Sequence, residues 1–281
     1  MENNNFALNR IFTQNTFKKL LSNTSNYETY YSVITRFVSN PYLKNNGDII
    51  SEIYLYLRKN YRNEYFYKNT LLNKLLLGVH KPSTTTALTE IPVGKSKADF
   101  VLINGKAVVY EIKTALDTFE RLKTQLVDYY KAFDHVAVLA DENNRKVIES
   151  KLLDTPVGIY LLTKKDQISC IKTPDKFIES LDTSEIFKVM NKEEYESVLL
   201  HFYEKLPEVP QVKYYRECKK LFCQINISES YPFFLEQLKK RNRIEIDEFN
   251  NVPYELKTLI YFSKYRKTDY EKLDLFLKQK F

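Results

Sequence analysis

Three charged residues between positions 99 and 113 have the types and spacing that phosphate chemistry requires. Glu111 and Lys113 lie two residues apart at the end of an apolar run, and Asp99 lies in the stretch before it. Side chains two apart on a β-strand point to the same face of the sheet. Two carboxylates supply the oxygen ligands that Mg²⁺ prefers, and a neighbouring lysine can orient a water molecule and neutralise charge on phosphorus. The stretch therefore predicts a divalent-metal site.

The turn between the two expected strands decides whether Asp99 reaches this site. If Asn104-Gly105 were a two-residue turn, Asp99 would face Tyr110 and lie on the wrong side of the sheet. If the loop is Ile103-Asn104-Gly105, closed by Gly105 in the left-handed region, Asp99 pairs with Val109 and shares a face with the other two charged residues. We predict the three-residue loop, or an equivalent bulge. The alternative to the whole site is a surface hairpin whose Glu-Lys ion pair contributes almost nothing to stability.

Short motifs around this hairpin resemble a known family. Asp99, the run Glu111-Ile112-Lys113, and a following Gln125-x-x-x-Tyr129 resemble the PD-(D/E)XK nuclease superfamily, and the last element is similar to its RecB-like branch. The run from Tyr61 to Tyr65 and the spacing from Arg121 to Gln125 resemble a bacterial and phage family within it. The resemblance covers residues 51–163. Ala98 stands where the superfamily often has proline.

This resemblance implies a metal-dependent nuclease that hydrolyses phosphodiester bonds, with DNA as the expected substrate. Asp99 and Glu111 would bind Mg²⁺ or Mn²⁺, with the Ile112 carbonyl as a third ligand, and Lys113 would position the attacking water. Two further acids would assist the site, namely Glu64 and Glu90.

Each of these two acids has another interpretation. Glu64 lies in a helix predicted over 48–77, where it could instead form an exposed i,i+4 pair with Lys68. Glu90 is expected to begin the first clear strand, where it could be an ordinary strand-edge residue.

Polar residues beside the hairpin are candidates for nucleic-acid contacts. Arg121, Gln125 and Tyr129 recur at every fourth residue of a helix predicted over 118–133, so they form one stripe that would hold the scissile strand and fix the lysine. The alternative is a solvated helix face. Lys95 and Lys97 are expected to line the mouth of the site and touch phosphates.

Strand and helix patterns alternate from the hairpin to about residue 163. Apolar runs predict strands over 135–140 and 157–163, with a helix over 143–152 between them and an edge strand over 167–171. This alternation predicts an α/β fold with a mixed sheet flanked by helices, which the resemblance specifies as a restriction-endonuclease-like core. We expect an N-terminal helical segment at 1–47, the nuclease-like core at 48–175 and a mainly helical C-terminal module at 176–281.

Composition bounds the partners and the location. A formal charge of +7 and a pI near 9.0 fit nucleic acid as a partner. The densest basic cluster, 239–243, could bind a phosphate backbone or be a solvated helix end. Three cysteines without metal-site spacing suggest reduced thiols, and no run of about 18 apolar residues occurs. We expect a cytoplasmic protein without membrane contact, with a protein partner or a second copy as candidates for binding the C-terminal module.

Two other functions fit the same residues. One is a nuclease-fold module that binds nucleic acid or protein without cleavage. The other is a phage-related or defence-related effector whose nuclease activity is gated by a partner.

Overall fold

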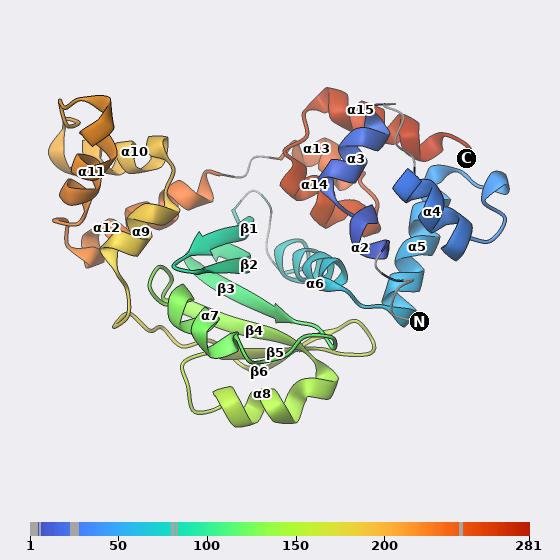
Figure 1. The fold of residues 1–281 in the computed structure, drawn as a ribbon, viewed down its shortest axis with the longest axis horizontal. Coiled ribbons are helices and arrows are strands. Elements are labelled where there is room, and N and C mark those ends of the chain that lie inside the picture. The colour runs from blue at the N-terminus through green and yellow to red at the C-terminus, as the bar shows by residue number, and fades with distance from the viewer. Residues whose placement is uncertain (1–4, 6, 23–27, 80–81, 83, 242–243) are drawn as a thin grey trace. The chain divides into compact units, whose positions relative to one another are not determined.

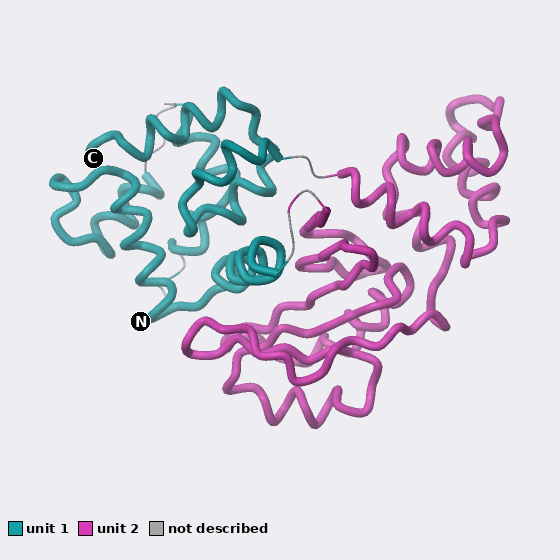
Figure 2. Tube along the Cα trace, turned by 180° about the vertical axis from the view of Figure 1, so that it is seen from behind, with its two compact units in different colours: residues 1–79, 243–281 teal, residues 80–242 magenta. Residues whose placement is uncertain are grey.

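The computed structural model describes residues 5, 7–22, 28–79, 82, 84–241 and 244–281, and Figure 1 shows its ribbon. The chain forms two compact units, one of residues 1–79 with 243–281 and one of residues 80–242 (Figure 2). The predicted core segment, 48–175, thus has residues in both units.

The unit of residues 80–242 is built on one six-stranded mixed sheet with the strand order β1-β2-β3-β4-β5-β6. β1, β2 and β3 are antiparallel, β3, β4 and β5 are parallel, and β6 is antiparallel to β5. The strands are β1 Thr86–Val93, β2 Ser96–Asn104, β3 Lys106–Lys113, β4 His135–Asp141, β5 Gly158–Leu162 and β6 Ile168–Lys172. The predicted α/β class with a mixed sheet flanked by helices is confirmed.

Two helices make the crossovers that parallel strands require. Helix α7, Leu122–Tyr129, connects β3 to β4, and α8, Arg145–Leu152, connects β4 to β5. Their apolar residues Leu126 and Ile148 join the buried core of the sheet. The crossover through α7 brings its polar side chains to the strand that carries Glu111 and Lys113.

Four more helices of the same unit share this core. They are α9 Thr183–Val189, α10 Lys192–Tyr203, α11 Gln211–Phe222 and α12 Ile227–Lys239. The ring of Phe234 on α12 lies 5.8 Å from that of Phe133, which precedes β4. The Thr86 hydroxyl donates a 2.7 Å hydrogen bond to the Lys239 carbonyl. The predicted helical character of the C-terminal part is confirmed.

The second unit is helical and combines the two ends of the chain. Asn69 joins them, because its side-chain amide donates to the Tyr254 carbonyl at 2.9 Å and its oxygen accepts from the Thr258 N–H at 3.0 Å. Its α-helices are α2 Leu8–Ile11, α3 Gln14–Leu21, α4 Glu28–Phe37, α5 Asn46–Asn60, α6 Glu64–Leu71, α13 Ile246–Asn250, α14 Lys257–Ser263 and α15 Lys267–Lys278. A π-helical turn at Leu72–Leu76 follows α6.

Two expected elements have other bounds. The single helix predicted over 48–77 is broken after Asn60, because Asn63 caps a new helix by accepting the Phe66 N–H at 3.2 Å. The strand expected to begin at Glu90 begins at Thr86 and turns back at Gly94 into β2.

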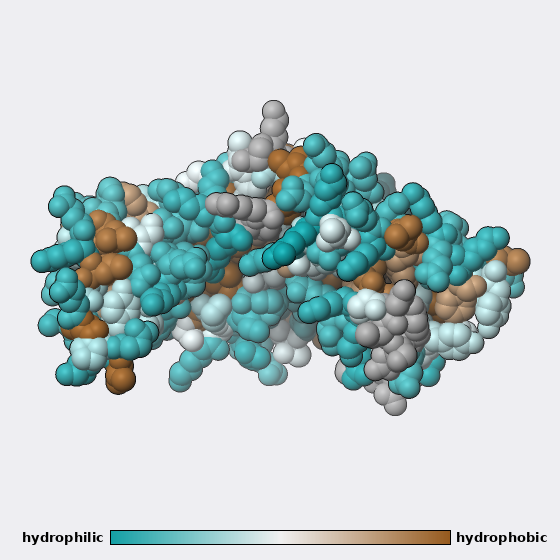
Figure 3. Space-filling view, turned by 90° about the horizontal axis from the view of Figure 1, so that it is seen from above, coloured by the Kyte–Doolittle hydropathy of each residue, from teal (hydrophilic) through white to brown (hydrophobic). Residues whose placement is uncertain are grey.

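Apolar side chains are mostly removed from the surface. Hydrophilic residues dominate the face drawn in Figure 3, where hydrophobic residues form small separate groups. Among the residues that the structure describes, no helix is long and apolar enough to cross a membrane.

Candidate functional site

The register of the β2–β3 hairpin puts the three predicted charged residues on one spot, although not by the predicted pairing. Val101 pairs with Val109 and Ile103 with Ala107, so the register continued outward places Asp99 opposite Glu111 rather than opposite Val109. The prediction of the pairing was therefore wrong by two residues. A shift of two preserves the sheet face, whereas a shift of one would have reversed it. Gly105 does adopt the predicted left-handed conformation, with φ 71°.

A buried ion pair forms the centre of the site. Lys113 Nζ lies 2.8 Å from Glu111 Oε1, and the two residues are only 7% and 1% exposed. The lysine also donates a 3.0 Å hydrogen bond to Gln125 Oε1 on α7. An ammonium has three N–H donors, and two of them are used within the described residues. The third is available to a water molecule or a phosphate oxygen.

Tyr129 supports the carboxylate from the same helix. Its hydroxyl oxygen lies 2.5 Å from Glu111 Oε2 and 2.8 Å from the Lys97 carbonyl oxygen. A hydroxyl has one proton to donate, and the charged carboxylate is the stronger acceptor. Burial, together with the negative charge of Glu111, raises the pKa of Tyr129 far above its ordinary value. The tyrosine therefore remains a neutral donor at physiological pH.

Asp99 adjoins this pair through the backbone of β3. The Ile112 N–H donates a 2.8 Å hydrogen bond to Asp99 Oδ2. Since this peptide lies between Glu111 and Lys113 in the chain, the Asp99 carboxylate reaches the stretch that carries both. Asp99 is half-buried, unlike Glu111.

Asp128 has a role that the sequence pattern did not reveal. Its Oδ2 accepts from the Lys95 N–H at 3.1 Å and from the Ser96 hydroxyl at 2.8 Å, and Lys131 pairs with its Oδ1 at 2.7 Å. Burial alone would raise the pKa of Asp128, but the bonds from Lys131 and Ser96 outweigh it and lower the pKa. The β1–β2 turn is thus tied to α7 beside Tyr129.

Glycine at the same turn makes this contact possible. Gly94 has φ 59°, and a Cβ atom there would lie 2.6 Å from Asp128 Oδ1. In the sequence, the available signal for this contact was a glycine in a turn, followed on the next helix by an acidic residue. The Gly94-Lys95-Ser96 turn is followed by a strand, whereas a phosphate-binding P-loop is followed by a helix. The turn is therefore not a P-loop.

The remaining predicted residues of the sheet unit lie at the surface. Glu90 lies inside β1 and is therefore not the start of a strand. Its backbone has φ 57°, and its carboxylate pairs with Lys97 at 3.2 Å. The side chains of Lys95 and Arg121 are exposed. Arg121 precedes α7 as its N-cap, which shortens the predicted helix.

Glu64 belongs to the helical unit. It is the first residue of α6, and its Oε1 pairs with Lys68 Nζ at 2.6 Å. This is the i,i+4 pair considered as the alternative to a catalytic role, and such exposed pairs contribute a few tenths of a kcal/mol. A part for Glu64 in catalysis stays a prediction.

The basic cluster at 239–243 is partly structural. Arg241 makes 2.6 Å hydrogen bonds to both carboxylate oxygens of Glu194 and to the Val189 carbonyl. These bonds tie the end of α12 to α9 and α10, so Arg241 is not a free phosphate contact. Residues 242–243 lie outside the described part of the chain.

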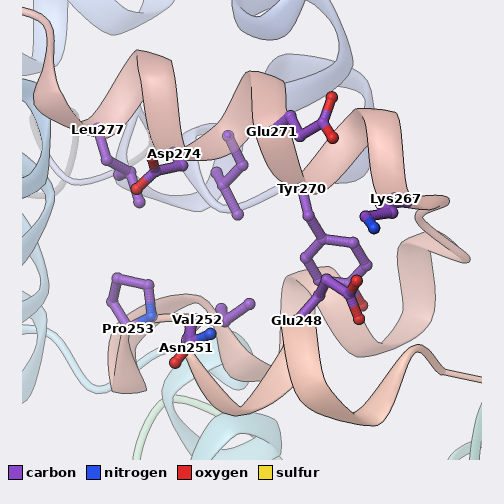
Figure 4. Close-up of a pocket in the computed structure, with 10 residues that line it drawn as sticks. Glu248, Asn251, Val252, Pro253, Lys267, Tyr270, Glu271, Asp274 and Leu277 are labelled. Carbon is purple, nitrogen blue, oxygen red and sulfur yellow. The ribbon is translucent and has the colours of Figure 1, made fainter.

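A cavity of about 410 Å³ in the helical unit is lined mainly by acidic rather than basic side chains (Figure 4). Glu248, Glu271 and Asp274 line it, and the figure shows the Tyr270 ring extending from α15 toward Glu248. Carboxylates would repel a phosphate backbone, so this cavity is not a candidate for nucleic-acid binding.

Comparison with known protein families gives one result. The family model described as bacteriophage P4 protein cII matches residues 57–258, which is more than half of the chain. The chain belongs to this family. The match extends from α5 to α14 and includes the whole hairpin site. No curated protein and no solved structure matches. The family description names no activity, so the site itself must indicate one.

Proposed function

We propose that this chain is a metal-dependent nuclease that hydrolyses phosphodiester bonds, with DNA as its substrate. The observation that carries the proposal is the Lys113 ammonium, which is bonded to Glu111 and Gln125, together with the Asp99 carboxylate, which accepts from the N–H of the residue between Glu111 and Lys113. Two carboxylates and one oriented lysine are a suitable set for phosphoryl transfer to water.

The donor atoms suit Mg²⁺ or Mn²⁺. Asp99 and Glu111 offer carboxylate oxygens, each with more than one lone pair, and the Ile112 carbonyl is a candidate third ligand on the same stretch. When bound, the metal would supply a Lewis acid and a more acidic water. Both Glu111 oxygens already accept a bond, so they would share their remaining lone pairs with the metal.

The protein's own groups have separate tasks in this proposal. Lys113 holds a proton toward the reacting phosphate and neutralises charge there, while Gln125 sets the direction of its ammonium. Tyr129 fixes the Glu111 rotamer. Lys95 and Lys97, on and beside the β1–β2 turn, and Arg121, which precedes α7, provide cations for the phosphates on either side. Glu64 and Glu90 are proposed as assisting acids.

One observation favours a second candidate function. Glu111 is 1% exposed and both of its oxygens are already bonded. A carboxylate satisfied in this way would also suit a module that binds nucleic acid or protein without cleavage. It would equally suit an effector whose site opens only when a partner binds.

The test is cleavage of circular plasmid and circular single-stranded DNA by purified wild type and Lys113→Gln, with Mg²⁺, with Mn²⁺ and with chelator. Lys146→Gln, on the exposed side of α8, is the matched control. We expect metal-dependent cutting by wild type and the control, with a loss of ~10²–10³-fold in Lys113→Gln. Equal cutting by a folded Lys113→Gln would contradict the assigned site. Binding of DNA without cutting of circular or linear DNA or RNA would favour the binding module.

A further inference from the structure

A second pocket of about 420 Å³ lies in the sheet unit, away from the site described above. The β2–β3 turn, the start of β4, the loop around Lys176 and one side of α12 line it. Lys106, at this pocket, and Glu111 are five residues apart on β3, which corresponds to about 17 Å along the strand. The pocket is therefore separate from the hairpin site.

Three lysines from three different segments line this pocket, namely Lys106, Lys176 and Lys239. Each of the three is exposed. The carboxylates of the lining are already engaged. Glu236 pairs with Lys240 at 2.7 Å, and Asp134 accepts from the Tyr231 hydroxyl at 2.7 Å. Because Glu236 is paired with Lys240, the three lysines face one further carboxylate, that of Asp134, and the lining keeps a net positive charge, which favours an anion.

The backbone at each lysine is anchored before any ligand arrives. Lys106 follows the left-handed Gly105 and pairs with Asn104 across the turn. The Phe177 N–H, next to Lys176, donates to the Asp134 carbonyl at 2.9 Å. The Lys239 carbonyl accepts from the Thr86 hydroxyl. Anchored segments lower the entropy cost of gathering three cations around one ligand.

A buried polar cluster forms the wall between these anchors. Asp134 Oδ1 accepts from Tyr231 and lies 2.8 Å from His135 Nδ1, and the Tyr231 hydroxyl oxygen accepts from the Asp134 N–H at 3.0 Å. All three residues are at most 9% exposed. These bonds join the start of β4 to α12, so the wall keeps its shape.

We infer that this pocket is a binding site for phosphate groups, held by Lys106, Lys176 and Lys239. The ligand is either the backbone of nucleic acid or a free polyphosphate, since both present the same anionic oxygens. That the phosphates belong to a nucleic-acid backbone rests on the function proposed above, whereas the affinity of the pocket for phosphate does not.

The test uses two probes with the full chain in the presence of EDTA. One is a fluorescein-labelled 20-base-pair DNA duplex, whose binding is followed by anisotropy as a function of salt, and the other is inorganic pyrophosphate, followed by calorimetry. The pocket variant is Lys106→Gln/Lys176→Gln/Lys239→Gln. The control variant removes three exposed lysines of the same unit that do not line the pocket, Lys146→Gln/Lys151→Gln/Lys213→Gln.

We expect the pocket variant to reduce the slope of log affinity against log salt by about 0.9 for each lysine that contacts a phosphate, with a smaller change in the control. If only pyrophosphate binding is lost in the pocket variant, the ligand is a free polyphosphate. Equal effects of both variants on both probes would overturn the inference. Because EDTA suppresses metal-dependent cleavage and only binding is measured, a failure of the nuclease proposal would leave this result interpretable.

Discussion

Replacing Lys113 by Met should destabilise the sheet unit strongly, because the substitution leaves Glu111 as an unpaired buried charge. At the observed 2.8 Å, the attraction between the two charges amounts to ~6 kcal/mol at an effective dielectric constant of about 20. Desolvation of two nearly inaccessible side chains offsets much of this attraction. Removing one partner of such a pair nevertheless costs about 3–5 kcal/mol, because the other charge stays buried.

A double variant separates this effect from simple loss of packing. Lys113→Met/Glu111→Gln replaces the pair by two neutral side chains, and the new amide can still accept from Tyr129. We expect the double variant to recover at least ~2 kcal/mol of the loss, since neutral replacements of buried pairs are often tolerated. A packing defect alone would persist in it.

The assay must report on the sheet unit, because the chain has two compact units and a single melting curve would average them. Hydrogen exchange of the β3 and β4 amides in increasing urea meets this need. A loss below ~1 kcal/mol in Lys113→Met would refute the reasoning, because that is the value of an exposed pair. Failure of the double variant to recover would refute it as well.

Three further predictions concern the groups around this pair. Tyr129→Phe removes the donor to Glu111 and should reduce the free energy of unfolding of the sheet unit by about 1.5–3 kcal/mol in the same hydrogen-exchange assay. Tyr129→Phe combined with Glu111→Gln should cost less than the sum of the two single variants. Asp128→Asn should be less stable than wild type, and the full difference in stability should be present above about pH 4. The difference should vanish as the pH falls through the lowered pKa of Asp128, because a depressed carboxyl pKa stabilises the fold only while the group is ionised. A difference that stays constant down to about pH 2 would contradict this. Gly94→Ala should cost the sheet unit at least ~1–2 kcal/mol in the hydrogen-exchange assay, because alanine is strained at φ 59° and its Cβ would meet the Asp128 carboxylate. A neutral result would argue against the observed turn.

The strands after the hairpin could be predicted because their signals are local. Apolar runs predicted β4 and β5 within one or two residues of their observed bounds, and the edge strand β6 was predicted over 167–171. Helical spacing over a hairpin predicted that the helix stripe would fix the lysine, and Gln125 does contact Lys113, whereas the bond from Tyr129 to Glu111 was not predicted. These features need only short-range patterns.

The pairing register and the bounds of the elements were harder to predict. Two registers that differ by two residues place Asp99 on the same face, so alternation of side chains cannot separate them. The break before α6 depends on one side-chain bond of Asn63, and the positive φ of Glu90 has no local signal in the sequence.

Which segments of the chain belong to each unit depends on contacts between residues that are distant in the sequence. The hydrogen bond from Asn69 to the Tyr254 carbonyl joins residues 185 positions apart, which no local pattern reveals. Asp128 was missed for a related reason, because the N–H and the hydroxyl that donate to its carboxylate lie on a turn 32 to 33 residues away.

The most direct test of the proposed nuclease is the rate of Mg²⁺-dependent plasmid cleavage by Asp99→Asn. This variant leaves the buried Glu111–Lys113 pair in place, and asparagine can still accept from the Ile112 N–H, so the fold should be kept. Asp154→Asn, an exposed acid of the same unit, is the control. We predict a loss of at least ~100-fold in Asp99→Asn with unchanged hydrogen exchange of the β3 and β4 amides in urea, and a control that cuts like wild type. Equal cleavage by folded Asp99→Asn and wild type would contradict the proposed site.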